Sequence, residues 1–198
     1  MSRKTTFERQ KEIKKAILDI IAAEGLHALS TRRLAQKVGL SEGALFRHFA
    51  TKRDMLLGIM EDVQNGLLKD LRAISLRTDS AENRLYDFLC THIEFLIEHR
   101  GITILLFSEA AHMNDTELKH KLRSILLTQK QYVSKIIQDG IVEGLWDAEL
   151  HVENVASLYL GIPITLNIEL VLNPQEVQTE NFCKRMICLL ERILKKNT

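Results

Sequence analysis

The chain has 198 residues, of which 45% are hydrophobic and 27% charged, a balance that excludes an intrinsically disordered protein. Its 9 glycines and 2 prolines fall well short of the roughly 24 that average usage would give, which argues against many short strands and favours long helices. The net charge is +1, but residues 1–53 hold 12 Lys and Arg against 5 Asp and Glu, whereas the remainder holds 15 against 21. A basic amino-terminal segment on an acidic body indicates a polyanionic partner for that segment; charges clustered by chance on solvated faces are the alternative.

The amino-terminal 50 residues predict three helices. Apolar residues recur three or four apart from Ile13 to Ile21, and Gly25 is placed to end that helix. Ser30 and Ser41 are candidate amino-terminal caps of a second helix and of a third at about residues 42–48. Two short helices joined by a glycine-containing turn predict a helix-turn-helix unit, whose second helix fits the major groove of DNA.

Hydroxyl and positively charged residues surround the third predicted helix and could contact phosphates. At its start, Gly43 would permit close approach to the groove, and Ala44 could offer a methyl group to thymine. Glu42 could accept a hydrogen bond from a cytosine amine or, equally well, repel phosphate. The candidate DNA-binding residues are Ser30, Thr31, Arg32, Arg33, Ser41, Glu42, Gly43, Ala44, Phe46, Arg47, His48 and Lys52.

Longer helices are predicted over the rest of the chain, at residues 53–76, 81–98, 102–112, 115–140, 152–171 and 178–195. Of the last two, the helix at 152–171 is apolar around nearly its whole circumference and the final helix has an apolar seam, which together favour a pair that packs on its own subunit and on a second copy. A central core helix in a monomer is the alternative for the first of them. The candidate dimer residues are Val155, Leu158, Tyr159, Ile162, Leu166, Phe182, Met186, Leu189, Leu190 and Ile193.

The segment from about Arg9 to Leu57 resembles the DNA-binding domain of the TetR family of transcriptional regulators. The resemblance lies in Gly-Leu-Ser-Glu-Gly-Ala-Leu-Phe-Arg-His-Phe-Ala-Thr-Lys, from Gly39 to Lys52. A looser similarity covers Gly144-Leu-Trp-Asp-Ala-Glu and the apolar helix after it. The TetR resemblance implies an all-α fold: a three-helix helix-turn-helix DNA-binding domain at residues 1–52, then a larger helical effector-binding and dimerisation domain at residues 53–198.

The same resemblance implies a function and assigns residues to it. A homodimer would bind a palindromic operator in double-stranded DNA, most often as a repressor released by a small molecule, with no cofactor. Phosphate contacts would come from Thr31, Phe46, His48 and Lys52, and close groove contacts from residues 41–44. The family usually has tyrosine where this chain has Phe46, so a hydroxyl that could bond a phosphate is missing here.

A small-molecule pocket in the helical body is implied as well. Its uncharged surroundings would favour an apolar or weakly polar effector, although aromatic residues at helical spacing more often form a core. The candidate lining residues are Phe88, His92, Phe95, Leu96, Leu106, Phe107, His112, Tyr132 and Trp146.

The cysteine spacing and the length of the longest apolar stretch indicate the cellular compartment. Cys90, Cys183 and Cys188 lack metal-ligand spacing and are expected to be reduced thiols in a cytoplasmic protein. The longest apolar stretch, residues 155–166, is shorter than the roughly 20 residues that cross a bilayer, so no membrane partner is expected.

An enzyme is the competing interpretation. Two Glu-x-x-His pairs, Glu109 with His112 and Glu117 with His120, have the spacing used in di-iron carboxylate bundles. Such sites take their pairs from different helices, whereas these lie only eight residues apart. A non-enzymatic protein without a metal or catalytic residues is therefore predicted.

Overall fold

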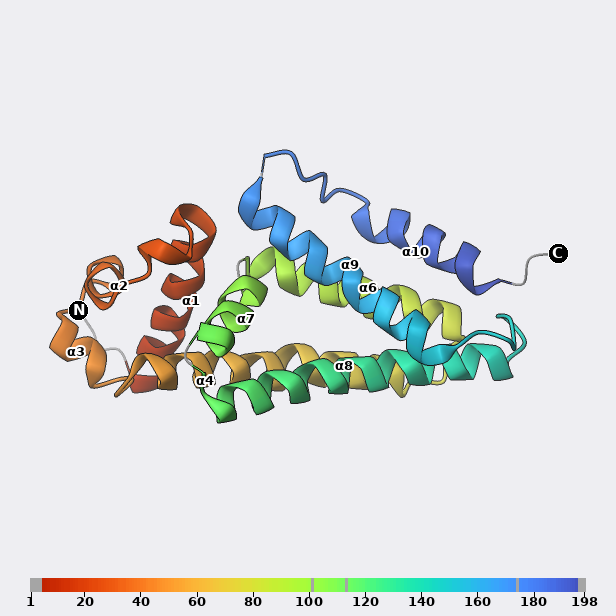
Figure 1. The fold of residues 1–198 in the computed structure, drawn as a ribbon, viewed down its shortest axis with the longest axis horizontal. Helices are drawn as coiled ribbons and strands as arrows, with labels where there is room; N and C mark the ends of the chain where they lie inside the picture. Colours follow the sequence, from red (N-terminus) through yellow and green to blue (C-terminus); the bar gives the residue numbers. More distant parts are fainter. Residues whose placement is uncertain (1–4, 101, 113, 174, 196–198) are drawn as a thin grey trace.

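The computed structural model describes residues 5–100, 102–112, 114–173 and 175–195, and in these residues all regular structure is helical. Figure 1 shows a small amino-terminal unit, here called the head, beside a larger body of longer helices. The predicted all-α fold is confirmed. The elements are α1 (Thr6–Glu24), the 3-10 turn η1 (Leu26–Ala28), α2 (Thr31–Val38), α3 (Glu42–Phe46), α4 (Lys52–Val63), the π-helical turn η2 (Gln64–Leu68), α5 (Lys69–Ser75), α6 (Ala81–Glu98), α7 (Ile102–His112), α8 (Thr116–Val142), α9 (Val152–Leu172) and α10 (Phe182–Leu194).

Local capping explains where the head helices begin and end. Ser30 Oγ accepts a hydrogen bond from the Arg33 N–H, and Ser41 Oγ accepts one from the Ala44 N–H, as expected of amino-terminal caps. Gly39 ends α2 with φ at 67°, in the left-handed region that glycine enters without a steric penalty. The helix-turn-helix unit is therefore formed by short-range rules.

The head is joined to the body by one continuous helical run, residues 52–75. Thr51 caps the run in a reciprocal pair of hydrogen bonds with Asp54, and the π-helical turn widens it at residues 64–68 without ending it. One hydrophobic core extends through both parts of the molecule, and α1 packs against α4, α7 and α9. A displacement in the body can therefore reach the head through packed, helical contacts.

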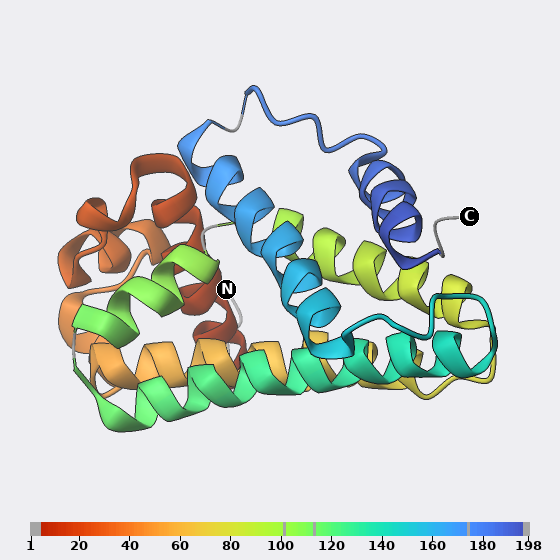
Figure 2. The ribbon, with the colours of Figure 1, turned by 45° about the vertical axis from the view of Figure 1, so that its right-hand side comes forward.

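The body is built around α8, which lies alongside α4, α5 and α6 and is crossed by α9 (Figures 1 and 2). Helix α9 is long and apolar enough, by length and composition alone, to span a bilayer, with 39% of its most apolar window buried. Five of its residues, Val155, Ala156, Tyr159, Leu166 and Leu170, belong to the protein core. The core side of α9 thus packs against neighbouring helices of the same chain.

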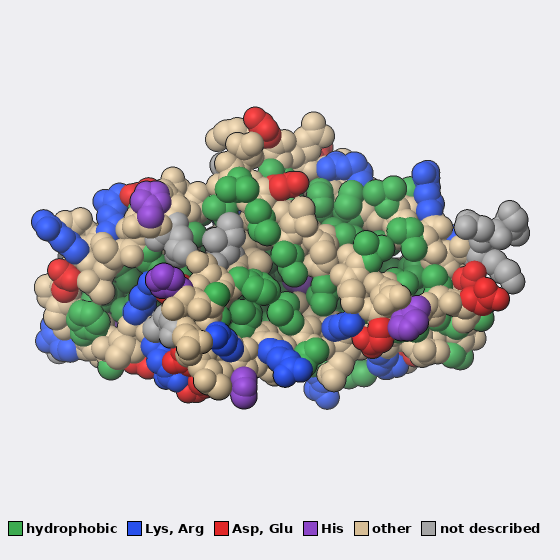
Figure 3. Space-filling model, in the orientation of Figure 1, with side chains coloured by type: hydrophobic (Ala, Val, Ile, Leu, Met, Phe, Trp, Pro, Cys, Tyr) green, Lys and Arg blue, Asp and Glu red, His purple; other side chains and the backbone are tan. Residues whose placement is uncertain are grey.

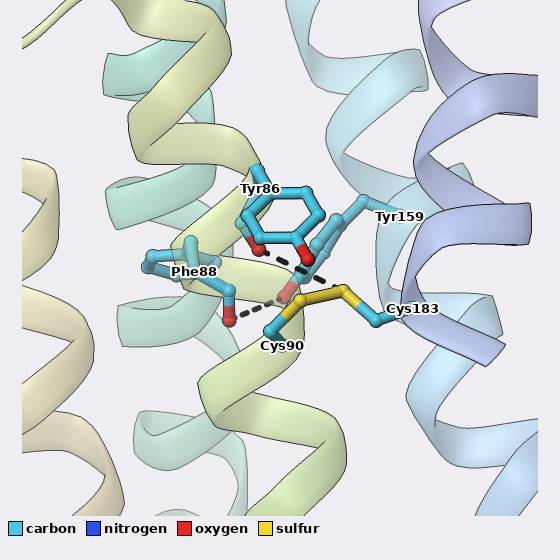
Figure 4. The surroundings of a disulfide bond; sticks show 5 residues. All are labelled: Tyr86, Phe88, Cys90, Tyr159 and Cys183. Atoms are coloured by element: carbon cyan, nitrogen blue, oxygen red, sulfur yellow. Dashed lines mark hydrogen bonds between the residues drawn. A yellow bond between two sulfur atoms is a disulfide. The ribbon is translucent and has the colours of Figure 1, made fainter. Parts of the chain in front are cut away.

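The cysteines differ from the prediction. Cys90 on α6 and Cys183 on α10 form a disulfide with a Cα–Cα distance of 5.4 Å, beside Tyr86 and Tyr159 (Figure 4), and only Cys188 is a free, exposed thiol. The expectation of three reduced thiols is therefore wrong for this structure. The pair is 93 residues apart in sequence, and only the packing of α10 on α6 brings the two side chains together.

Candidate nucleic-acid interface and body cavity

Helix α3 is fixed on one side and open on the other. Leu45 is fully buried and Phe49, just after the helix, is nearly so, whereas Glu42, Gly43 and Phe46 are exposed. A Cβ added at Gly43 would meet no heavy atom within 4 Å. The exposed face of α3 can therefore receive a partner as close as the backbone itself.

The starts of α2 and α3 are connected by a side-chain hydrogen bond. Thr31 Oγ1 donates to Glu42 Oε2 at 2.7 Å, and both residues lie at the surface. These two predicted DNA-contacting groups therefore touch each other in the free protein. The carboxylate is held at the start of α3, where a base edge or a phosphate would approach.

Positive charge flanks this face. Arg32 and Arg47 are exposed and form no ion pair within the described residues. Arg33 instead donates to Glu24 at 2.7 Å, a hydrogen bond that lowers the pKa of the Glu24 carboxyl and raises that of the guanidinium. Arg32 and Arg47 are thus available to contact phosphates. His48 is half-buried, with Nδ1 enclosed and without a hydrogen-bond partner.

Lys52 occupies a different position from the one predicted. Its Nζ donates to Glu109 Oε1 on α7 at 2.8 Å, and the lysine side chain is 44% exposed while that of the glutamate is only 9% exposed. Arg53, the next residue, pairs with Asp115 and Glu117 at the start of α8, and the Arg53 hydrogen bond contributes to a lowered pKa at Asp115 after the larger effect of the Leu118 N–H. Lys52 is therefore part of a link between head and body, not a free phosphate contact in this conformation.

These ion pairs also bear on the di-iron alternative. Glu109 and Glu117 are each bound to a cation of α4, and His112 and His120 are exposed. Among the described residues no group of three or more potential metal ligands is present. The two Glu-x-x-His pairs lie at the end of α7 and the beginning of α8 with their glutamates used in ion pairs, so the alternative is not favoured.

A small cavity lies inside the body, bordered by α4, α6, α7, α8, α9 and the π-helical turn, with a volume of about 50 Å³. Pockets that hold drug-sized ligands measure roughly 300–1,000 Å³, so a ligand of that size could enter only if the surrounding helices moved. Five predicted residues line this cavity: His92, Phe95, Leu96, Leu106 and Phe107.

Four other predicted lining residues lie elsewhere. Phe88 is fully buried against the Tyr159 ring, with ring centres 5.5 Å apart. Trp146 packs so closely on α8 that a Cβ at Gly140 would lie 2.2 Å from its ring. His112 is exposed and Tyr132 packs against the core. These residues fill space or face solvent, as the core interpretation allowed.

Sequence reasoning missed the polar side chain of Gln129. It lines the cavity and is only 5% exposed. Its position was detectable, because Leu122, Ile125 and Val133 continue the same buried face of α8 at helical spacing. Also missed were Val63, Leu67, Ile102, Thr103, Leu122, Ile125, Leu126 and Ile164.

The outer faces of α9 and α10 carry exposed apolar residues, and Figure 3 shows hydrophobic side chains gathered over these two helices. Of the predicted dimer residues, Leu158, Leu189 and Ile193 are about half-exposed, and Ile162, Phe182 and Met186 are partly buried. Four other predicted dimer residues are buried within the single chain, which leaves them little surface for a partner. These are Val155, Tyr159, Leu166 and Leu190. Ile168 and Leu172 are exposed on the same face of α9 and were missed.

Comparisons with known proteins agree with this geometry. Residues 13–59 match the family model described as bacterial regulatory proteins, tetR family. The nucleoid occlusion factor SlmA of Actinobacillus pleuropneumoniae is 30% identical over 123 residues, which are 62% of this chain and 61% of that protein. The chain therefore spans about three fifths of the length of the curated relatives it matches.

Solved structures share the fold along nearly the whole chain. The ketosteroid transcriptional regulator KstR2 of Mycobacterium tuberculosis superposes with a TM-score of 0.79 at 20% identity, covering 96% of each chain. The MbdR regulator of Azoarcus sp. CIB superposes with a TM-score of 0.80 at 19% identity, covering 95% of this chain and 100% of that one. At these identities the likeness concerns the fold.

Proposed function

We propose that this chain is a transcriptional repressor of the TetR family, because residues 13–59 match the model of bacterial regulatory proteins, tetR family, and the fold is that of solved transcriptional regulators. It binds a palindromic operator as a homodimer in the cytoplasm and is released by a small, largely apolar effector. Residues 1–52 contact DNA, and residues 53–198 dimerise and bind the effector. The observation that carries the proposal is the open face of α3 around Gly43, with Arg32 and Arg47 uncommitted beside it.

DNA contact follows from the exposed side of the helix-turn-helix unit. Gly43 admits the groove wall next to the α3 backbone, and Arg32 and Arg47 reach phosphates on either side. Glu42 accepts from a cytosine amine once Thr31 turns its hydroxyl to phosphate, or else rejects other sequences by repulsion. Phe46 is 41% exposed and contributes packing against the sugar-phosphate backbone.

The apolar outer face of α9 and α10 is the dimer interface in this proposal. Leu158, Leu172, Leu189 and Ile193 are each about half-exposed or more, and a continuous exposed apolar patch commonly marks a protein interface. Gly161 lies on the same exposed side of α9 with open space around its Cβ position. A second copy covering this face buries these side chains and fixes the separation of the two α3 helices.

Helix α7 supplies the route from effector to DNA. Thr103, Leu106 and Phe107 line the cavity, and Glu109 on the same helix holds Lys52 of α4. An effector larger than the cavity of about 50 Å³ displaces α7, and the intact Glu109–Lys52 ion pair carries that displacement to α4 and the head. Differential binding to the two arrangements then lowers DNA affinity by the typical allosteric factor of about 5–150.

Selection of bound DNA from a random pool tests the central claim. The expected result is an inverted repeat whose half-sites are one helical turn, roughly 34–36 Å, or a multiple of it apart. Sedimentation of the same protein gives a dimer that Ile193→Asp dissociates and Leu127→Asp, on the exposed outer face of α8, leaves intact. A strictly monomeric protein, or one that selects no sequence at moderate ionic strength, would falsify the proposal.

A second candidate comes from the curated relatives named nucleoid occlusion factors, which match 62% of this chain. A role in nucleoid occlusion would use the same DNA-binding head. Genome-wide mapping of bound sites separates the two candidates: sites at a few promoters favour the repressor, and sites spread along the chromosome without relation to promoters favour nucleoid occlusion.

A further inference from the structure

The cavity wall contains polar groups that the protein does not use. Of the 14 described residues that line it, eleven are apolar, and the polar ones are His92, Thr103 and Gln129. No lysine, arginine, aspartate or glutamate is among these 14. The recognition chemistry at this site therefore depends on uncharged hydrogen-bonding groups.

His92 uses only one of its ring nitrogens. Its side chain is 4% exposed, and Nδ1 lies 3.4 Å from the hydroxyl of Tyr159, which in turn donates to the Phe88 carbonyl at 3.5 Å. Nε2 has no hydrogen-bond partner among the described residues. With Tyr159 donating to Phe88, Nδ1–H donates to the hydroxyl oxygen and Nε2 is left as an acceptor; the opposite tautomer makes Nε2 a donor.

Gln129 faces the cavity from α8 and makes no hydrogen bond to any described residue. Asn167 provides the contrast: it is fully buried, but its Oδ1 accepts from the Thr103 N–H at 3.2 Å and its Nδ2 donates to the Leu96 carbonyl at 3.3 Å. Asn167 is a structural residue with both ends satisfied, whereas Gln129 keeps a donor and an acceptor free.

From these two unsatisfied side chains we propose that the effector is an apolar molecule carrying one uncharged hydroxyl group, which His92 and Gln129 bind together. This inference rests on the effector site of the proposed function. A hydroxyl both donates and accepts, so it can donate to His92 Nε2 while accepting from the Gln129 amide, or donate to Gln129 Oε1 while accepting from the other tautomer. An ether or a ketone can only accept, so in the tautomer in which Tyr159 donates to Phe88 it pairs with the Gln129 amide and leaves His92 Nε2 unpaired.

Charged head groups do not match the site. Burial lowers the pKa of His92 to about 4, so the imidazole is neutral at pH 7 and offers no counterion to a carboxylate. With no cation or anion among the described lining residues, an ionised group would be transferred into an apolar cavity unpaired. The remaining lining, which includes Phe95, Leu106 and Ile125, suits a hydrocarbon chain or ring.

Calorimetric titration of the full-length protein at pH 7 with 1-octanol, methyl octyl ether, octanoate and octylammonium tests the proposal. These probes share a hydrocarbon chain and differ in the head group. We expect 1-octanol to bind at least roughly tenfold more tightly than the ether, because unpaired groups of the site would otherwise stay buried, and both ions to bind more weakly still. In Gln129→Leu the preference for the alcohol over the ether falls to about twofold or less, whereas Gln131→Leu, exposed on the same helix, retains it.

Several results would overturn the proposal: equal affinity for alcohol and ether in the wild type, tighter binding of either ion, or no binding of 1-octanol up to its solubility limit. The comparison of probes on the wild-type protein needs no variant to fold. Operator binding measured without additive decides the proposed function separately, so a chain that binds DNA but shows no hydroxyl preference refutes this inference alone.

Discussion

Replacing Glu109 by glutamine tests whether Lys52 has to leave the body in order to contact DNA. In the free protein Lys52 Nζ lies 2.8 Å from Glu109 Oε1, and the carboxylate side chain is only 9% exposed. When Lys52 leaves, the buried Glu109 carboxylate loses its hydrogen-bond donor at a cost of about 1–3 kcal/mol. The lower end of this range applies because the lysine side chain is 44% exposed and solvent screens the ion pair. The glutamine has no negative charge to leave unpaired, so Glu109→Gln is expected to raise operator affinity about five- to tenfold at low salt.

Fluorescence anisotropy with a selected operator, repeated over a range of salt concentrations, measures this effect. Lys52→Ala is expected to lower affinity and to flatten the slope of log K against log salt by about 0.9, the value for one phosphate contact. In the Lys52→Ala background, Glu109→Gln should change nothing further. Glu61→Gln, which removes an ion pair to Lys121 within the body, is the matched control and should leave operator affinity unchanged. An equal gain from Glu109→Gln in both backgrounds, or a loss in the wild type, would refute the reasoning.

Four further outcomes are expected. Gly43→Ala should stabilise α3 slightly, by at most about 1 kcal/mol, yet weaken operator binding at least tenfold, since the added methyl group enters the space left for DNA; unchanged affinity in anisotropy would contradict this. Because burial lowers the pKa of His92 to about 4, the imidazole binds a proton near pH 6.5 in the unfolded chain but only near pH 4 in the folded chain. As the pH drops from 7 to 4, the free energy of unfolding of the wild type should therefore fall by up to about 3 kcal/mol more than that of His92→Gln. An equal fall in the two proteins, measured by denaturant unfolding at each pH, would contradict this. Reducing the Cys90–Cys183 disulfide should remove up to about 4–5 kcal/mol, given its 93-residue separation, whereas an unfolding temperature that is the same with and without reductant would count against a stabilising tether. Gly140→Ala should unfold at a clearly lower temperature, because its Cβ would meet the Trp146 ring at 2.2 Å, and an unchanged temperature would show that the ring moves freely.

Much of the head was predictable from local sequence because its elements depend on neighbours a few residues apart. Ser30 and Ser41 cap their helices with side-chain hydrogen bonds to N–H groups three residues on, and Gly39 ends α2 through its own backbone conformation. Such rules act within one or two helical turns, so a single chain segment contains all the required information. The same holds for the existence of the long body helices, whose apolar periodicity is a property of each segment.

The partners of the functional side chains depended on distances that no local pattern contains. Lys52 meets Glu109 across 57 residues, and Cys90 meets Cys183 across 93, so the link to the body and the disulfide exist only after the helices pack. The sequence alone determined that a basic helix-turn-helix unit precedes an apolar helical body. The tertiary structure decided which side of α9 and α10 is buried, which polar groups the cavity leaves unsatisfied and which cation the body holds, because each of these depends on what another helix places opposite.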